Sequence, residues 1–147
     1  FNNLNQNEMA VCQQGMNDYH IVTHDNRLLQ PMDTILENKV ALIKLEQALP
    51  LMGENVFVFT HHAPSYTSMT DAYRSEEVKG AYANHMDEFI IQNSNIKYWA
   101  HGHVHETNNY MVGGCNVISN PRGYHNYGEN PDFNIQMEIE LCDSPTG

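Results

Sequence analysis

The sequence has few cysteines, few cationic side chains and no long apolar run. Its three cysteines, Cys12, Cys115 and Cys142, lie far apart and form no C-x-x-C pair. That spacing argues against a disulfide scaffold and a zinc ribbon, so we expect a reducing, cytoplasmic setting. The apolar runs are too short to cross a membrane, and no signal peptide is visible, so we expect no membrane partner.

Cationic side chains are outnumbered: 7 Lys and Arg stand against 18 Asp and Glu, which gives a net charge of -11 with neutral histidines. This charge repels phosphate backbones, so long nucleic acid is not an expected partner. The 147 residues suffice for about one domain. The chain begins with Phe1 rather than Met, and we therefore expect a fragment or a processed product.

Apolar spacing predicts the order of the elements. Residues 1–17 are polar and lack a period, which favours a loop or a poorly ordered lead, and 19–23 could form a short strand. Apolar faces at helical spacing predict helices over 34–49, capped by Asp33 or Thr34, and over 76–92. Further strands are expected at 56–59 and 96–100, in a hairpin around Gly113-Gly114, and at 133–141, where apolar and polar residues alternate. The order predicts an α/β fold that ends in antiparallel strands.

Five of the nine histidines fall in two segments, Thr60-His61-His62-Ala63-Pro64 and His101-Gly102-His103-Val104-His105. Each segment follows a predicted buried strand, and ligands bind at the carboxyl ends of parallel strands. Side chains two apart in an extended chain point the same way, so His103 and His105 can converge, and His101 has the same parity. Imidazole is a common metal ligand. A lone H-x-H motif seldom binds a metal, but two histidine clusters at the ends of two strands predict a metal site at one sheet edge.

The segments VFVFTHHAPSY and KYWAHGHVHETNNYMVGGCNVISNPRGY resemble the calcineurin-like metallophosphoesterases. The likeness is to bacterial and phage members that carry T-H-H-A-P, G-H-x-H and S-N-P-R-G-Y segments, and it spans about 19–141. It implies that residues 19–147 are the C-terminal half of a single domain, a four-layer α/β/β/α sandwich with a mixed sheet, preceded by a polar lead over 1–18.

The resemblance also implies site residues and cofactors. His61 and His103 would bind one metal and His105 the other. His62 would support the ligands or face the substrate, or alternatively be a solvent-exposed neighbour; whether His61 or His62 is the ligand stays open. Apart from the resemblance, the planar guanidinium of Arg122 could meet a phosphate oxygen, although the pattern favours a turn fixed by Pro and Gly in which Arg122 caps carbonyls. The family uses two divalent metal ions, Mn, Fe, Zn or Ni, whose bridging hydroxide attacks the phosphorus of a phosphoester substrate.

Three motifs of this family, D-x-H, G-D-x-x-D and G-N-H, supply its remaining ligands. Only Asp18-Tyr19-His20 matches one of them, and no buried strand precedes it. We therefore expect at most a partial site, and an enzyme that is active only when a missing N-terminal half completes it, in the same polypeptide or as a second chain. The alternatives are a non-catalytic binding or assembly module and, more weakly, a mononuclear zinc hydrolase.

Overall fold

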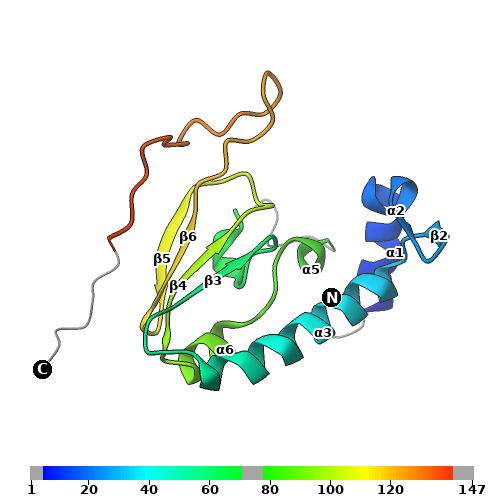
Figure 1. The fold of residues 1–147 in the computed structure, drawn as a ribbon. Coiled ribbons are helices and arrows are strands. Elements are labelled where there is room, and N and C mark those ends of the chain that lie inside the picture. The colour runs from blue at the N-terminus through cyan, green and yellow to red at the C-terminus, as the bar shows by residue number, and fades with distance from the viewer. Residues whose placement is uncertain (1–4, 71–77, 141–147) are drawn as a thin grey trace, which may run out of the picture.

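The computed structural model describes residues 5–70 and 78–140, and its centre is a four-stranded mixed sheet (Figure 1). The strand order is β3-β4-β6-β5. Three strands run parallel, and β5 pairs with β6 in an antiparallel hairpin. The strands are β3 (Val56–Thr60), β4 (Ile96–His101), β5 (Asn108–Val112) and β6 (Cys115–Ser119). The α/β class, the two parallel strands and the hairpin at Gly113 are thus confirmed.

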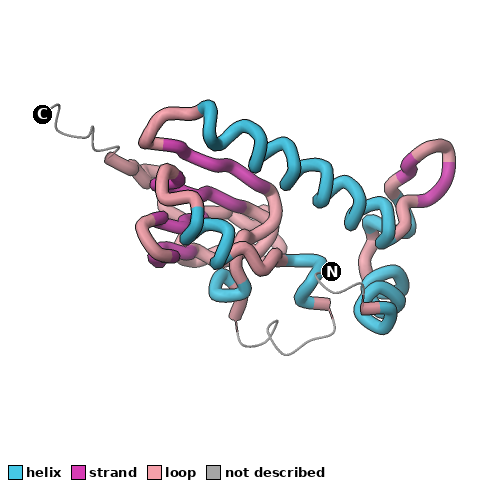
Figure 2. The backbone as a smooth tube through the Cα atoms, turned by 90° about the horizontal axis from the view of Figure 1, so that it is seen from below, coloured by secondary structure: helices cyan, strands magenta, loops and turns pink. Residues whose placement is uncertain are grey.

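One face of the sheet carries the main core. Val58, Trp99 and Val117 occupy it from three neighbouring strands, and each is at most 8% exposed. The long helix α3 (Pro31–Ala48) runs beside the strands (Figure 2) and contributes Leu42 and Leu45, which pack against this cluster. The short turn η1 (Leu49–Leu51) extends α3, and its buried Leu49 belongs to the same core.

The opposite face of the sheet is apolar and largely open. Phe57 and Phe59 stack on it at 4.3 Å between ring centroids, yet Phe59 is 72% exposed. Within the part of the chain that the structure describes, an extended segment near the C-terminus lies against this face, where the hydroxyl of Tyr98 donates to the carbonyl of Glu140 at 3.0 Å. A shallow cavity of about 300 Å³ lies there, lined by Phe57, Phe59, Ala100, His101, Ile118, Ser119, Asn120, Met137 and Ile139. We call this surface the outer sheet face.

The strand expected over 133–141 is wrong for its described part, since residues 131–140 form turns and extended chain. The carbonyls of Asn130 and Asn134 accept from the amides of Phe133 and Met137, and these turns interrupt the alternating pattern. Leu141 lies outside the described residues. An alternating segment needs a partner strand to become part of a sheet, and no described strand pairs with it.

The loop and strand expected before residue 23 are also wrong where the chain is described. Two helices form instead, α1 (Gln6–Gly15) and α2 (Asp18–Ile21), followed by the small hairpin β1 (Thr23–His24) and β2 (Arg27–Leu28). The side chain of Asn5 caps α1 by accepting from the amides of Asn7 and Glu8. None of the helices in the described residues has the length and apolar character needed to cross a bilayer.

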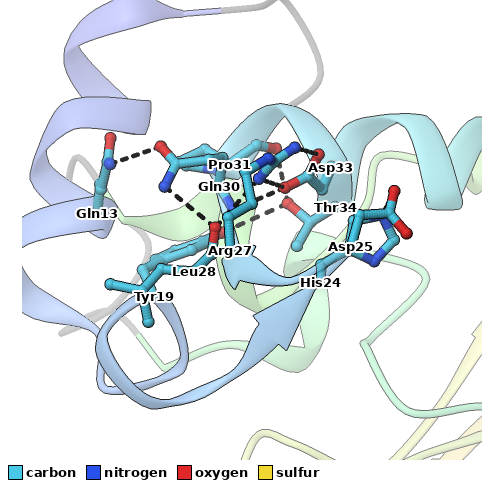
Figure 3. A network of polar contacts seen from close by, with 10 residues as sticks. All are labelled: Gln13, Tyr19, His24, Asp25, Arg27, Leu28, Gln30, Pro31, Asp33 and Thr34. Atoms are coloured by element: carbon cyan, nitrogen blue, oxygen red, sulfur yellow. Dashed lines mark hydrogen bonds and ion pairs between the residues drawn. The ribbon is translucent and has the colours of Figure 1, made fainter.

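The start of α3 is fixed by a polar network (Figure 3). The helix begins at Pro31, three residues before the expected start, because proline suits the first helical turn. Asp33 accepts from the amide of Gln30 and from both terminal nitrogens of Arg27, at 2.7 Å each. These hydrogen bonds, chiefly those from Arg27, lower the pKa of Asp33 to about 2. The N-cap residue is therefore Gln30, not Asp33 or Thr34 as expected, and Asp33 accepts a hydrogen bond from the backbone amide of Gln30 within the first turn of the helix.

The helix expected over 76–92 is divided into α5 (Lys79–Tyr82) and α6 (Asp87–Gln92); residues 76 and 77 lie outside the described chain. The break arises from pairing with the first histidine segment. Ala83 forms an isolated parallel bridge with Ala63, and the amides of Asn84 and Met86 donate to the carbonyls of Ala63 and Pro64. The turn η2 (Tyr66–Ser68) follows that segment.

Candidate functional site

The parallel pairing of β3 and β4 brings the two histidine segments together. Thr60 pairs with His101 at the strand ends, and the ladder continues where the amide of Gly102 donates to the carbonyl of His61 at 3.0 Å. The His103 ring centroid lies 4.9 Å from that of His61 and 4.7 Å from that of His62. Segments some forty residues apart in sequence thus meet at one sheet edge, as the strand-end argument predicts.

Two consecutive hydrogen bonds through the hydroxyl of Thr60 fix the turn that contains His61 and His62. The buried indole of Trp99 donates to Thr60 Oγ1 at 2.8 Å, and Thr60 Oγ1 donates to the carbonyl of His62 at 2.7 Å. Because Trp99 is only 1% exposed, these two hydrogen bonds connect the turn at His61 and His62 to the centre of the core.

His101 faces the interior, so the expectation that it shares a direction with His103 and His105 is wrong. Its Nδ1 donates to the carbonyl of Gly102 at 3.0 Å, and its Nε2 accepts from the hydroxyl of Ser68 at 2.8 Å. Ser68 Oγ in turn accepts from the hydroxyl of Tyr110 at 2.6 Å. A serine beside a histidine suggests nucleophilic catalysis, but Ser68 is 1% exposed, so no substrate reaches it in this conformation. The network instead holds the end of β4.

His103 has the features of an unused metal ligand. Its Nε2 is buried and has no hydrogen-bond partner, which is uncommon for a polar atom in a folded protein. Burial, with His62 and His61 nearby, lowers the pKa of His103 to about 4, so the ring is neutral at pH 7. Its φ of 63° is left-handed, so the tight turn in this segment is made by His103 rather than by Gly102. Tyr82 stacks on the ring at 4.8 Å between centroids.

A cavity of about 610 Å³ opens beside these rings, and we call it the histidine pocket. His105 lines it and meets the edge of Tyr124, with 4.6 Å between ring centroids. Glu106 adds a carboxylate to the lining. The described residues that line it are Gly15, Met16, Asn17, Asp18, His61, Met69, Tyr82, His103, Val104, His105, Glu106 and Tyr124.

The two residues expected to act on substrate are not part of this lining. His62 touches His61 and His103 through its ring but stays exposed at the surface. Arg122 is exposed in the loop after β6, where its Nη2 lies 3.2 Å from His125 Nδ1. Its carbonyl accepts from the amide of Asn130, which closes the loop. Arg122 therefore lies in an exposed loop, two residues before Tyr124 of the pocket lining.

The donor types in the pocket suit a divalent cation, because neutral imidazoles and carboxylates bind Zn, Mn and Fe. The unpaired nitrogen of His103 points to the same chemistry. Across residues 5–70 and 78–140, however, no three His, Cys, Asp or Glu side chains surround a common point closely enough to hold a metal ion. The described residues therefore include side chains of types that bind metals, but fewer than three of them are close enough together to bind one ion.

Asp18 is the pocket residue that sequence reasoning set aside. It belongs to the Asp18-Tyr19-His20 match, yet the structure separates the two candidate ligands of that match. Asp18 lines the histidine pocket, whereas His20 Nε2 lies 3.0 Å from the carbonyl of Gln14 on α1. The position of Asp18 depends on the packing of α2, for which the local sequence holds no signal.

No protein-family model and no solved structure matches the chain. An uncharacterized protein of Acanthamoeba polyphaga mimivirus is 24% identical to it over 158 residues. That alignment covers 96% of this chain and 53% of the viral protein, so the chain spans about half the length of the curated relative it matches. The resemblance to metallophosphoesterases stays a prediction.

Proposed function

We propose that this chain is part of a metal-dependent phosphoester hydrolase of the calcineurin-like kind. The observation that carries the proposal is the buried, neutral and unpaired nitrogen of His103, which lies beside His61 and His62 where two parallel strands end. A nitrogen in that state costs free energy in the folded protein unless a ligand uses it.

The pocket residues have separate parts in this proposal. His61 and His103 bind one divalent cation, and His105 binds another. Tyr82 holds the plane of the His103 ring, and Tyr124 holds that of His105. His62, exposed beside them, faces the substrate. Two divalent cations, when bound, activate water and stabilise the charge on the phosphoryl oxygens.

The proposed enzyme needs a further segment, an N-terminal half in the same polypeptide or in a second chain. Two observations support this. The outer sheet face leaves Phe59 72% exposed, where a second sheet of a four-layer sandwich would pack. The viral relative is about twice as long as the aligned region. The missing half would supply the carboxylate ligands that a two-metal site requires.

Metal binding is tested by titrating the chain with Mn²⁺ and comparing His103→Ala with His24→Ala. His24 lies in the β1–β2 hairpin, outside the pocket. We expect His103→Ala to abolish measurable binding and His24→Ala to leave it unchanged. Equal binding by both variants would mean that the pocket is not the metal site.

Hydrolysis is tested with bis-p-nitrophenyl phosphate and Mn²⁺. We expect the pure chain to show little turnover, and a longer polypeptide that adds the N-terminal half to be active unless His103 is replaced. Robust turnover by the pure monomer would contradict the need for a second half. A metal-loaded longer polypeptide without turnover on any phosphoester would contradict the hydrolase itself.

A second candidate function is a binding or assembly module without catalysis. It is favoured by the absence of a closed three-ligand set in the described residues and by the open outer sheet face. Such a module would bind its partner equally well when His103 is replaced, whereas the hydrolase would lose activity.

A further inference from the structure

The histidine pocket has a second wall, which the sequence motifs do not reveal. Residues 15–18, at the junction of α1 and α2, line the same cavity as His61, His103 and His105. Figure 1 shows α5 between the end of β3 and the α1–α2 pair, so this short helix separates the two walls. The N-terminal helices are therefore part of the site.

Side-chain packing holds this wall in place. Tyr19 is 5% exposed and forms a small core with Cys12 of α1 and Ala81 of α5. The residue after Ala81 is Tyr82, which packs against that core and stacks on the ring of His103. A continuous set of contacts thus runs from α2 through α5 to the imidazole, and it fixes where Asp18 stands.

The lining of the pocket has a definite charge. Among the described residues, it contains two carboxylates, Asp18 and Glu106, and no lysine or arginine. Within the described residues the Asp18 carboxylate has no hydrogen bond or ion pair, so its charge is not neutralised by a neighbour. It acts on His62 and His103, where it opposes the effect of burial on their pKa values. An anion alone would be repelled from this pocket, and a cation would be attracted.

We propose that Asp18 is the carboxylate through which the α1–α2 wall draws a divalent cation to the imidazoles of the histidine pocket. This inference rests on the proposed metal site and adds a positioning residue to it. Asp18 acts through its charge across the cavity, since the described residues do not bring three ligands to one point.

The test measures Mn²⁺ affinity of the full chain from the electron paramagnetic resonance signal of the free ion. Asp18→Asn removes one charge and keeps the shape of the side chain. We expect it to weaken binding roughly five- to tenfold, the size expected for a unit charge acting on a divalent ion across a solvated pocket. Asp25→Asn is the matched control, because Asp25 carries the same charge in the β1–β2 turn, and its effect should stay below about twofold.

Two further measurements separate charge from folding. Salt should shrink the difference between wild type and Asp18→Asn, since the screening length falls from about 10 Å at 0.1 M to about 3 Å at 1 M. Asn17→Asp adds a carboxylate to the same wall and should tighten Mn²⁺ binding. A loss of affinity through misfolding would show neither behaviour, and circular dichroism of each variant checks the helices.

The outcomes distinguish this inference from the function on which it rests. If His103→Ala abolishes binding but Asp18→Asn behaves like Asp25→Asn, the role of Asp18 is overturned and the metal site stands. If the wild-type chain binds no Mn²⁺, both are overturned. If Asp18→Asn weakens binding in a salt-dependent way and Asn17→Asp strengthens it, the inference is supported.

Discussion

At the scale of single residues, the hydroxyl of Thr60 links the core to the histidine turn. It accepts from the indole of Trp99 and donates to the carbonyl of His62. Replacing it by valine keeps the shape but leaves a buried indole N–H without a partner. We expect Thr60→Val to lower the free energy of unfolding by about 1–3 kcal/mol.

Urea unfolding followed by the fluorescence of Trp99, the single tryptophan, measures this loss. Thr70→Val is the control, because Thr70 is exposed. An unchanged midpoint for Thr60→Val would show that water replaces the lost hydroxyl.

The buried hydroxyl of Ser68 satisfies two partners at once, His101 and Tyr110. Ser68→Ala leaves both without that partner, and we expect the free energy of unfolding to fall by about 1–3 kcal/mol. The comparison is with Ser94→Ala, at an exposed position before β4, where no change is expected. Equal thermal midpoints for the two variants would contradict a structural role for the network.

At the scale of elements, Asp33 makes the start of α3 sensitive to acid. Its pKa is about 2 in the folded chain, below the ordinary value of 3.8, chiefly because Arg27 donates to it. A lowered carboxyl pKa contributes stability above the unfolded value, and this contribution is lost as the pH falls through the folded value. The loss therefore belongs to the window from about pH 4 to about pH 2.

Urea midpoints measured across this window test the assignment. We expect the wild-type chain to lose more stability than Asp33→Asn between these limits, because the variant has no carboxylate to protonate at that position. Asp25→Asn should follow the wild-type curve. Parallel curves for wild type and Asp33→Asn would show that the ion pair with Arg27 does not favour the folded state.

The elements that the sequence predicted correctly are those with a strong local signal. The run Val56–Phe59 and the Gly113-Gly114 pair define strands and hairpin by themselves. The break between α5 and α6 depends instead on hydrogen bonds to Ala63 and Pro64, about twenty residues away. Helix α1 has one fully buried side chain, Cys12, and so shows almost no apolar period.

In the candidate site, too, some features could be predicted from the sequence and others depend on tertiary contacts. The meeting of His61 with His103 follows from the rule that parallel strands end at one edge, which the sequence is enough to apply. The approach of Asp18 depends on the contact between Tyr19 and Ala81, and nothing in either segment foretells that contact. The inward turn of His101 depends likewise on Ser68, thirty-three positions before it.

At the scale of the whole molecule, the outer sheet face determines how the chain behaves alone. Phe57, Phe59 and Ile139 line an open apolar surface, and such surfaces bind partners or hydrophobic dyes. We expect the chain to enhance the fluorescence of an apolar dye, and Phe59→Ser to reduce that signal.

Leu51→Ser serves as the control for this effect. Leu51 is 87% exposed but stands in η1, outside the outer sheet face. A signal that falls equally for both variants would show that the dye responds to general surface hydrophobicity. Addition of the proposed N-terminal half should remove the signal from the wild-type chain.

The stacking of Tyr82 on His103 has a dynamic consequence. The same tyrosine packs against Cys12 and Tyr19, so a ligand that stiffens the imidazole also stiffens the support of α1 and α2. Binding of a cation in the pocket should therefore slow the hydrogen–deuterium exchange of backbone amides in α1 and α2, although neither helix contributes an imidazole to the proposed metal site. Occupancy of the pocket could then be followed by mass spectrometry in peptides from the opposite wall.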